Sequence, residues 1–104
     1  MNMINIDVTE FSKEPFGRYP TDGDFHGQRF RNEVLKVKLN QPLIEDVVVD
    51  FTGISLGVGS SFLEEAFGGL VRDGFDKNQL KAHLIIKDRM GIYHKQVMRF
   101  IEVA

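Results

Sequence analysis

Residues 47–71 read VVVDFTGISLGVGSSFLEEAFGGLV, and this stretch decides the fold. It opens with three valines and Phe51, an apolar run typical of a strand that is buried on both faces of a sheet between helices. A glycine-bearing loop, residues 52–59, follows the strand, and apolar side chains then recur at helical spacing. These side chains are Phe62, Leu63, Ala66, Phe67, Leu70 and Val71. The stretch therefore predicts a central strand, a loop and a helix that ends near Gly74.

The segments on either side predict further strands and helices. Residues 3–8 alternate between apolar and polar side chains, as an edge strand with one wet face requires. Apolar spacing from Phe30 to Leu39 predicts a helix with Asp24 as its N-cap. Residues 82–86 predict another short buried strand. A C-terminal helix is predicted from the spacing of Tyr93, Val97, Met98 and Ile101.

The order of these elements sets the fold class. Strands that alternate with helices form a largely parallel sheet with right-handed crossovers. Residues 12–27 contain several glycines and prolines and predict a loop, within which residues 16–19 could pair back as a short strand. We therefore expect one α/β domain over residues 1–104, with a mixed, mostly parallel sheet of about four strands flanked by three or more helices.

Composition and charge narrow the functional class. The chain has no cysteine, which excludes disulfides, thiolate metal sites and cysteine nucleophiles. With a net charge of -2 the chain has no overall attraction for polyanions, so nucleic-acid binding would need a local patch, formed by Arg18, Arg29 and Arg31. We interpret Arg29 and Arg31 as solvated side chains. The sequence shows no signal peptide and no apolar run of about 20 residues. We expect a cytoplasmic protein without a membrane span.

Ser60 and Ser61 stand where the central strand gives way, through the glycine loop, to a helix. The first N–H groups of a helix lack partners, and the helix dipole adds about half a positive charge there, so a phosphate on either serine would be stabilised. Ser61 and Glu64 also have the spacing of a capping box, which would give the serine a structural role. The two interpretations can coexist, because phosphorylation of a cap serine changes the helix end.

The neighbouring residues complete a candidate partner-binding surface. We expect Glu64 and Glu65 to be exposed and to form an acidic lip beside the serines. Gly68 and Gly69 inside a helix each cost about 0.8–1.0 kcal/mol relative to alanine, so close internal packing, which we favour, or a partner must offset them. The candidate residues are Gly59, Ser60, Ser61, Phe62, Glu64, Glu65 and Gly68.

Several motifs resemble those of STAS domains. Residues 50–54 (DFTGI) and 59–63 (GSSFL) look like the strand end and the helix opening of anti-anti-sigma factors, although Gly59 replaces an Asp and Phe62 a Gly. Together with the motifs Gly17-Arg18-Tyr19, Asp22-Gly23, Arg29-Phe30-Arg31 and residues 66–70, this block is more closely similar to a STAS-like family of small uncharacterised bacterial proteins.

The resemblance implies a small regulatory protein-interaction module of the anti-anti-sigma kind. It also implies that a serine at the helix N-terminus is phosphorylated, with Ser61 the better match for the acceptor and Ser60 the second candidate. The partner implied by this kinship is an ATPase or kinase of the histidine-kinase fold.

No catalytic, metal or cofactor site is predicted. A nucleophile elbow needs the pattern G-x-S-x-G, and residues 59–63 fail at Leu63. The glycine loop lacks the third glycine of a dinucleotide fingerprint and the lysine of a P-loop. Asp22, Asp24 and His26 are close in sequence, but we interpret them as turn and cap residues. The alternative function is a small ligand-binding domain or enzyme that uses the same helix N-terminus as an anion site.

Overall fold

The computed structural model describes residues 3–104, which contain a three-stranded parallel sheet. Its strands are β1 (Ile4–Asp7), β2 (Val47–Asp50) and β3 (Leu84–Lys87), in the order β1-β2-β3. In register, Ile6 lies beside Val49 and Val49 beside Ile86. The prediction of β2 as the central strand is confirmed. The prediction of about four strands in a mixed sheet is wrong, because residues 16–19 form no strand and all the described pairings are parallel.

Within residues 3–104, four helical segments accompany the sheet. The first runs through α1 (Gly27–Phe30), the π-helical η3 (Arg31–Leu35) and α2 (Lys36–Lys38). The second runs through α3 (Ser60–Leu63), the π-helical η4 (Glu64–Gly68) and α4 (Gly69–Arg72). The others are α5 (Lys77–His83) and α6 (Ile92–Val103), and short 3-10 turns lie at η1 (Val8–Glu10) and η2 (Pro20–Asp22). None of the helices in residues 3–104 is long and apolar enough to cross a membrane.

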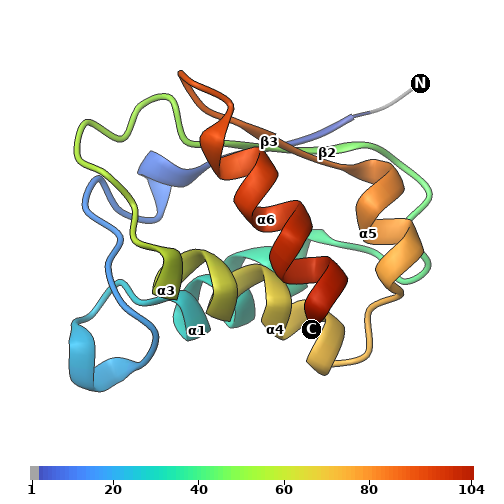
Figure 1. Ribbon diagram of the computed structural model, residues 1–104, viewed down its shortest axis with the longest axis horizontal. Helices are drawn as coiled ribbons and strands as arrows, with labels where there is room; N and C mark the ends of the chain where they lie inside the picture. Colours follow the sequence, from blue (N-terminus) through green and yellow to red (C-terminus); the bar gives the residue numbers. More distant parts are fainter. Residues whose placement is uncertain (1–2) are drawn as a thin grey trace.

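The helices α1, α3, α4 and α6 lie on one side of the sheet (Figure 1). This follows from the strand order, since successive crossovers of one hand along a sheet in chain order place their helices on the same face. Val47 and Val49 point into the core and are buried, whereas Val48 between them is only half-buried and Ile85 is exposed. The prediction that the valine run is buried on both faces is therefore wrong. Buried and more exposed side chains alternate along the strands because helices cover only one face of the sheet.

Buried phenylalanines join the two long helical segments to the sheet. The rings of Phe30 and Phe62 have centroids 5.5 Å apart, and Phe67 lies 6.3 Å from Phe30 and 6.4 Å from Phe51. All four side chains are at most 2% exposed. Burying an aromatic side chain of this size contributes about 1.5–3 kcal/mol, so this cluster fixes the helix from Ser60 against the sheet.

Two boundaries differ from the predicted ones. The first helix begins at Gly27, and its N-cap is His26, whose Nδ1 accepts the N–H of Arg29 at 3.2 Å; Asp24 lies two residues too early. Helix α5 was not predicted, and Ala82 belongs to it rather than to a strand. Leu80 is the only buried residue of α5, so the segment lacks the repeated apolar spacing that reveals the longer helices.

Candidate functional site

Ser60 and Ser61 form the exposed first turn of α3, at the carboxyl end of the sheet. Gly59 is the N-cap in an extended conformation (φ -72°, ψ 154°), and no side chain caps the helix. The predicted helix start is therefore confirmed, whereas the predicted capping box between Ser61 and Glu64 is wrong. Glu64 instead binds two arginines, which hold its carboxylate away from the helix terminus.

Three members of the predicted surface lie inside the protein. Phe62 is fully buried against Phe30, Gly68 is buried, and Glu65 is 5% exposed. The expected acidic lip is wrong for Glu65, and Glu64 is only partly exposed. Phe62, Glu65 and Gly68 pack between the helices. Gly59 and the two serines therefore form the exposed part of the predicted surface.

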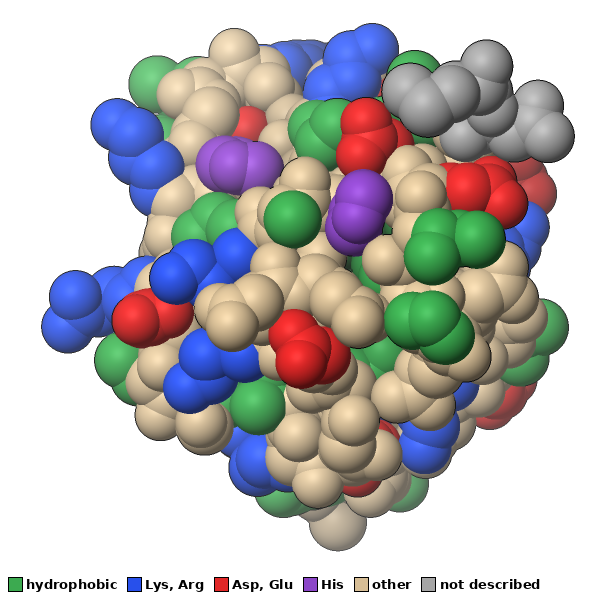
Figure 2. Space-filling model, turned by 90° about the vertical axis from the view of Figure 1, so that its right-hand side faces the viewer, with side chains coloured by type: hydrophobic (Ala, Val, Ile, Leu, Met, Phe, Trp, Pro, Cys, Tyr) green, Lys and Arg blue, Asp and Glu red, His purple; other side chains and the backbone are tan. Residues whose placement is uncertain are grey.

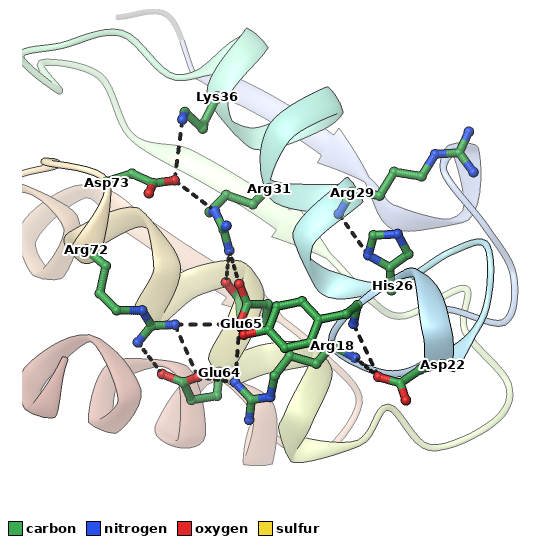
Figure 3. A network of polar contacts seen from close by, with 11 residues as sticks. Arg18, Asp22, His26, Arg29, Arg31, Lys36, Glu64, Glu65, Arg72 and Asp73 are labelled. Atoms are coloured by element: carbon green, nitrogen blue, oxygen red, sulfur yellow. Dashed lines mark hydrogen bonds and ion pairs between the residues drawn. The ribbon is translucent and has the colours of Figure 1, made fainter.

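A network of ion pairs surrounds the two glutamates (Figure 3). Glu64 accepts from Arg18 and is bound by Arg72 at 2.7 Å. Glu65 is bound by Arg31 at 2.7 Å and by Arg18 at 3.3 Å. Arg18 comes from the loop before α1, Arg31 from η3 and Arg72 from α4, so the two carboxylates link three parts of the chain that lie apart in sequence.

Arg31 is the buried centre of this network. Its side chain is 8% exposed and donates to the backbone oxygen of Glu65 as well as to the carboxylate, while its Nε donates to Asp73 Oδ2 at 2.9 Å. Lys36 also pairs with Asp73, at 3.3 Å. Our interpretation of Arg31 as a solvated side chain is wrong, because a guanidinium with this many acceptors can be buried.

Arg29 points elsewhere and binds a different set of groups. Its Nε donates to Glu33 at 2.9 Å, and its guanidinium lies over the rings of Phe25 and Phe11, at 5.0 and 5.8 Å from their centroids. The three arginines proposed for a nucleic-acid patch therefore do not converge. Each is engaged by carboxylates within the fold.

The charges of the outer part of the network reinforce one another. The pKa of Glu64 lies below its ordinary value, chiefly because Arg72 donates to the carboxylate and then because Arg18 does. In return, Glu64 raises the pKa of both Arg18 and Arg72. The carboxylate and both guanidiniums are therefore held in their charged forms.

The glycines of these helices are explained by internal packing. A Cβ at Gly69 would overlap the guanidinium of Arg31, and one at Gly68 would lie 2.5 Å from Glu64 Oε2. A Cβ at Gly27 would lie 2.7 Å from the backbone oxygen of Phe62, so the two long helical segments cross in close contact there. The close packing that we favoured for Gly68 and Gly69 is thus present inside the molecule.

The loop before α1 lies beside the serines, which sequence analysis did not foresee. A hollow of about 310 Å³ is lined by Ser61 and Gly59 and, across from them, by loop residues 16–19, 21 and 22. Asp22 Oδ2 accepts the N–H groups of Arg18 at 2.9 Å and Tyr19 at 3.2 Å, and these bonds lower its pKa. Gly17 has a φ of 82°, which allows the turn. The Gly17-Arg18-Tyr19 motif is therefore the sequence signal from which this loop could have been found.

The residues weighed as metal ligands have structural roles. Asp22 holds the loop, and His26 caps α1. Within residues 3–104, no three His, Cys, Asp or Glu side chains are arranged to hold a metal ion.

Residues 26–89 match the model of a family described as a STAS-like domain of unknown function (DUF4325). The matched residues make up more than half of the chain. The chain belongs to this STAS-like family. The predicted resemblance is confirmed, and the matched part of the STAS-like domain includes all of β2, β3 and the helix from Ser60. Arg18 and its loop precede the matched part. Neither the curated proteins nor the solved structures that were compared contain a match.

Proposed function

We propose that this STAS-like domain is a regulatory protein-interaction module, and that its partner docks at the carboxyl end of the sheet, beside Ser61. The observation that carries the proposal is a set of large apolar side chains exposed on the loops and at the start of α6 at this end, each between 44% and 79% accessible. We call this set the apolar rim: Phe16, Tyr19, Leu56, Met90 and Ile92. Exposed apolar patches of this kind are typical of protein-interaction sites.

The rim is continuous with the serines through three neighbouring hollows. Ser61 and Phe16 line the first, of about 310 Å³. Phe16 and Leu56 line the second, and Leu56 lines the third together with Met90 and Ile92, each of about 240 Å³. A partner that covers the rim would therefore reach Ser61.

The opposite end of the molecule has a different character. Figure 2 views it from the side of α5, where charged side chains of both signs are interspersed with small separate groups of hydrophobic ones. Such a mixed surface is typical of a solvated face rather than of a docking site.

Phosphorylation of Ser61 would regulate this interaction, with Ser60 as the second candidate. The proposed donor is ATP bound to a kinase of the histidine-kinase fold. The Ser61 hydroxyl oxygen forms a bond to the γ-phosphorus, the bond from that phosphorus to ADP breaks, and the hydroxyl proton passes to a base on the kinase. The exposed position of Ser61 and the uncapped N–H groups of α3 support this step.

We propose binding rather than catalysis for this domain. Each histidine uses Nδ1 for a contact within the fold: His26 with the N–H of Arg29, His83 with Asp46, and His94 with the N–H of Ile86. A serine nucleophile needs a base within hydrogen-bond reach, and in residues 3–104 none of these histidines is hydrogen-bonded to Ser60 or Ser61.

The test first searches the genes next to the one for this chain for an ATPase of the histidine-kinase fold, and then uses that ATPase in purified form. We expect Leu56→Asp to weaken its binding at least tenfold, because the substitution places a charge in the rim. Ile44→Asp is the matched control, since Ile44 is 72% exposed in the loop before β2 and outside the rim. Calorimetry measures the affinities, and circular dichroism checks the fold. Equal binding by wild type and Leu56→Asp, with loss in Ile44→Asp, would place the docking site elsewhere.

A further inference from the structure

The ion-pair network beside Ser61 contains more positive than negative charge. Its cations are Arg18, Arg31, Lys36 and Arg72, and its carboxylates are Glu64, Glu65 and Asp73. Four cations and three carboxylates leave one net positive charge within the network. The hollow that Ser61 lines also contains the carboxylate of Asp22, so the attraction for a phosphate dianion there rests on Arg18, the cation among its lining residues.

Arg18 is the cation that the network can release. Glu64 keeps Arg72, whose two terminal nitrogens lie 2.7 and 3.2 Å from its oxygens, and Glu65 keeps Arg31 at 2.7 Å. Without Arg18, both carboxylates still have a partner. Removal of Arg31 would instead leave Glu65 buried with only Arg18 and the more distant Arg72 beside it.

Arg18 is also placed to reach Ser61. Ser61 precedes Glu64 and Glu65 by three and four residues, so it lies on the same face of the helix, one turn earlier. Arg18 donates to both glutamates and lines the same hollow as Ser61. A phosphate on Ser61 would enter the hollow that Arg18 also lines.

The backbone around Arg18 is held on both sides. Its N–H donates to Asp22 Oδ2 at 2.9 Å, and its carbonyl oxygen accepts from the N–H of Gln28 at 3.1 Å. The carbonyl oxygen of Gly17 accepts from the N–H of Gly27 at 2.9 Å. The side chain of Arg18 can therefore change partner while the loop keeps its place.

We infer that Arg18 binds the phosphate of phosphorylated Ser61, and that it leaves Glu64 and Glu65 to do so. This inference rests on the proposed function, because it takes Ser61 as the modified residue. A phosphoserine carries a charge of about −1.5 to −2 against −1 for a carboxylate, and arginine can bind a phosphate through two parallel hydrogen bonds. Phosphorylation then changes the charge pattern next to Phe16 and Tyr19, and it leaves the buried part of the network intact.

The experiment installs phosphoserine at position 61 of the full chain by genetic encoding and follows its second ionisation by ³¹P NMR. A nearby guanidinium lowers the pKa of the phosphate, which is about 6 when free. We expect Arg18→Ala to raise this pKa by about 0.5–1 unit, with Arg18→Lys retaining part of the shift.

Two controls separate a direct contact from a general effect of charge. Lys36→Ala removes a cation of the same network that pairs with Asp73 and not with the glutamates, and it should leave the pKa of the phosphate nearly unchanged. Phosphoserine at position 60, which lies about 100° around the helix, should show little dependence on Arg18. An unchanged pKa in Arg18→Ala, or an equal shift in Lys36→Ala, would overturn the inference.

The result is independent of whether a kinase modifies Ser61. The phosphate is installed during synthesis, and no partner is present in the titration. If Leu56→Asp binds the ATPase normally while the titration depends on Arg18, the proposed docking site fails and the phosphate contact stands. The opposite pair of results overturns the contact alone.

Discussion

Glu64 and Glu65 are neighbours in η4, yet they belong to different environments. The side chain of Glu65 is 6% exposed and pairs with Arg31, which is 8% exposed. The side chain of Glu64 is 23% exposed, and its partners Arg18 and Arg72 are 33% and 45% exposed. The inner pair lies where the two π-helical segments meet, whereas the outer group is nearer the solvent and its Arg18 lines the hollow beside Ser61.

This difference separates structural from exchangeable ion pairs. Breaking a buried pair leaves an uncompensated charge in a medium of low dielectric, which costs several kcal/mol. An exposed pair is screened by water and contributes about 0–1 kcal/mol. We therefore expect Arg31 and Glu65 to hold the helices together and Arg18 to be available for another ligand.

The largest effect is expected at the inner pair. Arg31→Ala should lower the free energy of unfolding by about 3–5 kcal/mol, because Glu65 loses its buried partner. Urea denaturation followed by circular dichroism measures this change. Arg29→Ala is the matched control on the same helical segment, since Arg29 pairs with the exposed Glu33, and it should lose about 1 kcal/mol or less. Equal losses would show that burial does not distinguish the two arginines.

A smaller effect is expected in acid and depends on the outer carboxylate. The folded-state pKa of Glu64 is lowered, chiefly by Arg72, so its contribution to stability is fully present above the unfolded pKa of about 4.5 and is lost as the pH falls below that value. Asp22 and Asp50 contribute with the same sign, through N–H bonds to Asp22 and the Thr52 hydroxyl bond to Asp50. The midpoint temperature of thermal unfolding should therefore decrease as the pH is lowered below about 4.5.

Glu64→Gln isolates the share of this acid dependence that belongs to Glu64. The variant removes one titrating group with a lowered pKa, so its stability should depend less steeply on pH in the same range. A titration curve parallel to that of the wild type would show that the outer pairs contribute nothing measurable.

The smallest effect on stability is expected for Arg18. Arg18→Ala should change the free energy of unfolding by about 1 kcal/mol or less, since Glu64 retains Arg72 and Glu65 retains Arg31. The same denaturation experiment measures it. A loss as large as that of Arg31→Ala would mean that Arg18 is structural and cannot be released to a phosphate.

The local pattern was enough to predict most helices and strands. The unbroken run from Val47 predicted the central strand, and the apolar spacing from Phe62 to Val71 predicted the helix that carries the serines. These predictions succeed because apolar residues at a fixed period must share one buried face. Helix α5 was missed because only Leu80 in it is buried.

The candidate site was predicted only in part, because it depends on contacts between distant residues. The sequence placed Ser60 and Ser61 at a helix N-terminus, which is a local property of a strand, a loop and a helix. It could not place Arg18 beside them, 43 positions before Ser61, because that contact exists only once the loop folds back onto α3.

By itself, the sequence determined the alternation of strands and helices, the central place of β2 and the membership of the STAS-like family. Only the tertiary structure decided which charges are buried. Glu64 and Glu65 look alike in sequence, and burial is set by what packs over each side chain: Gly27 and Gly69 let the two helical segments approach until Arg31 covers Glu65. Because the strength of an ion pair depends on its exposure to water, that packing also decides which arginine is free to change partner.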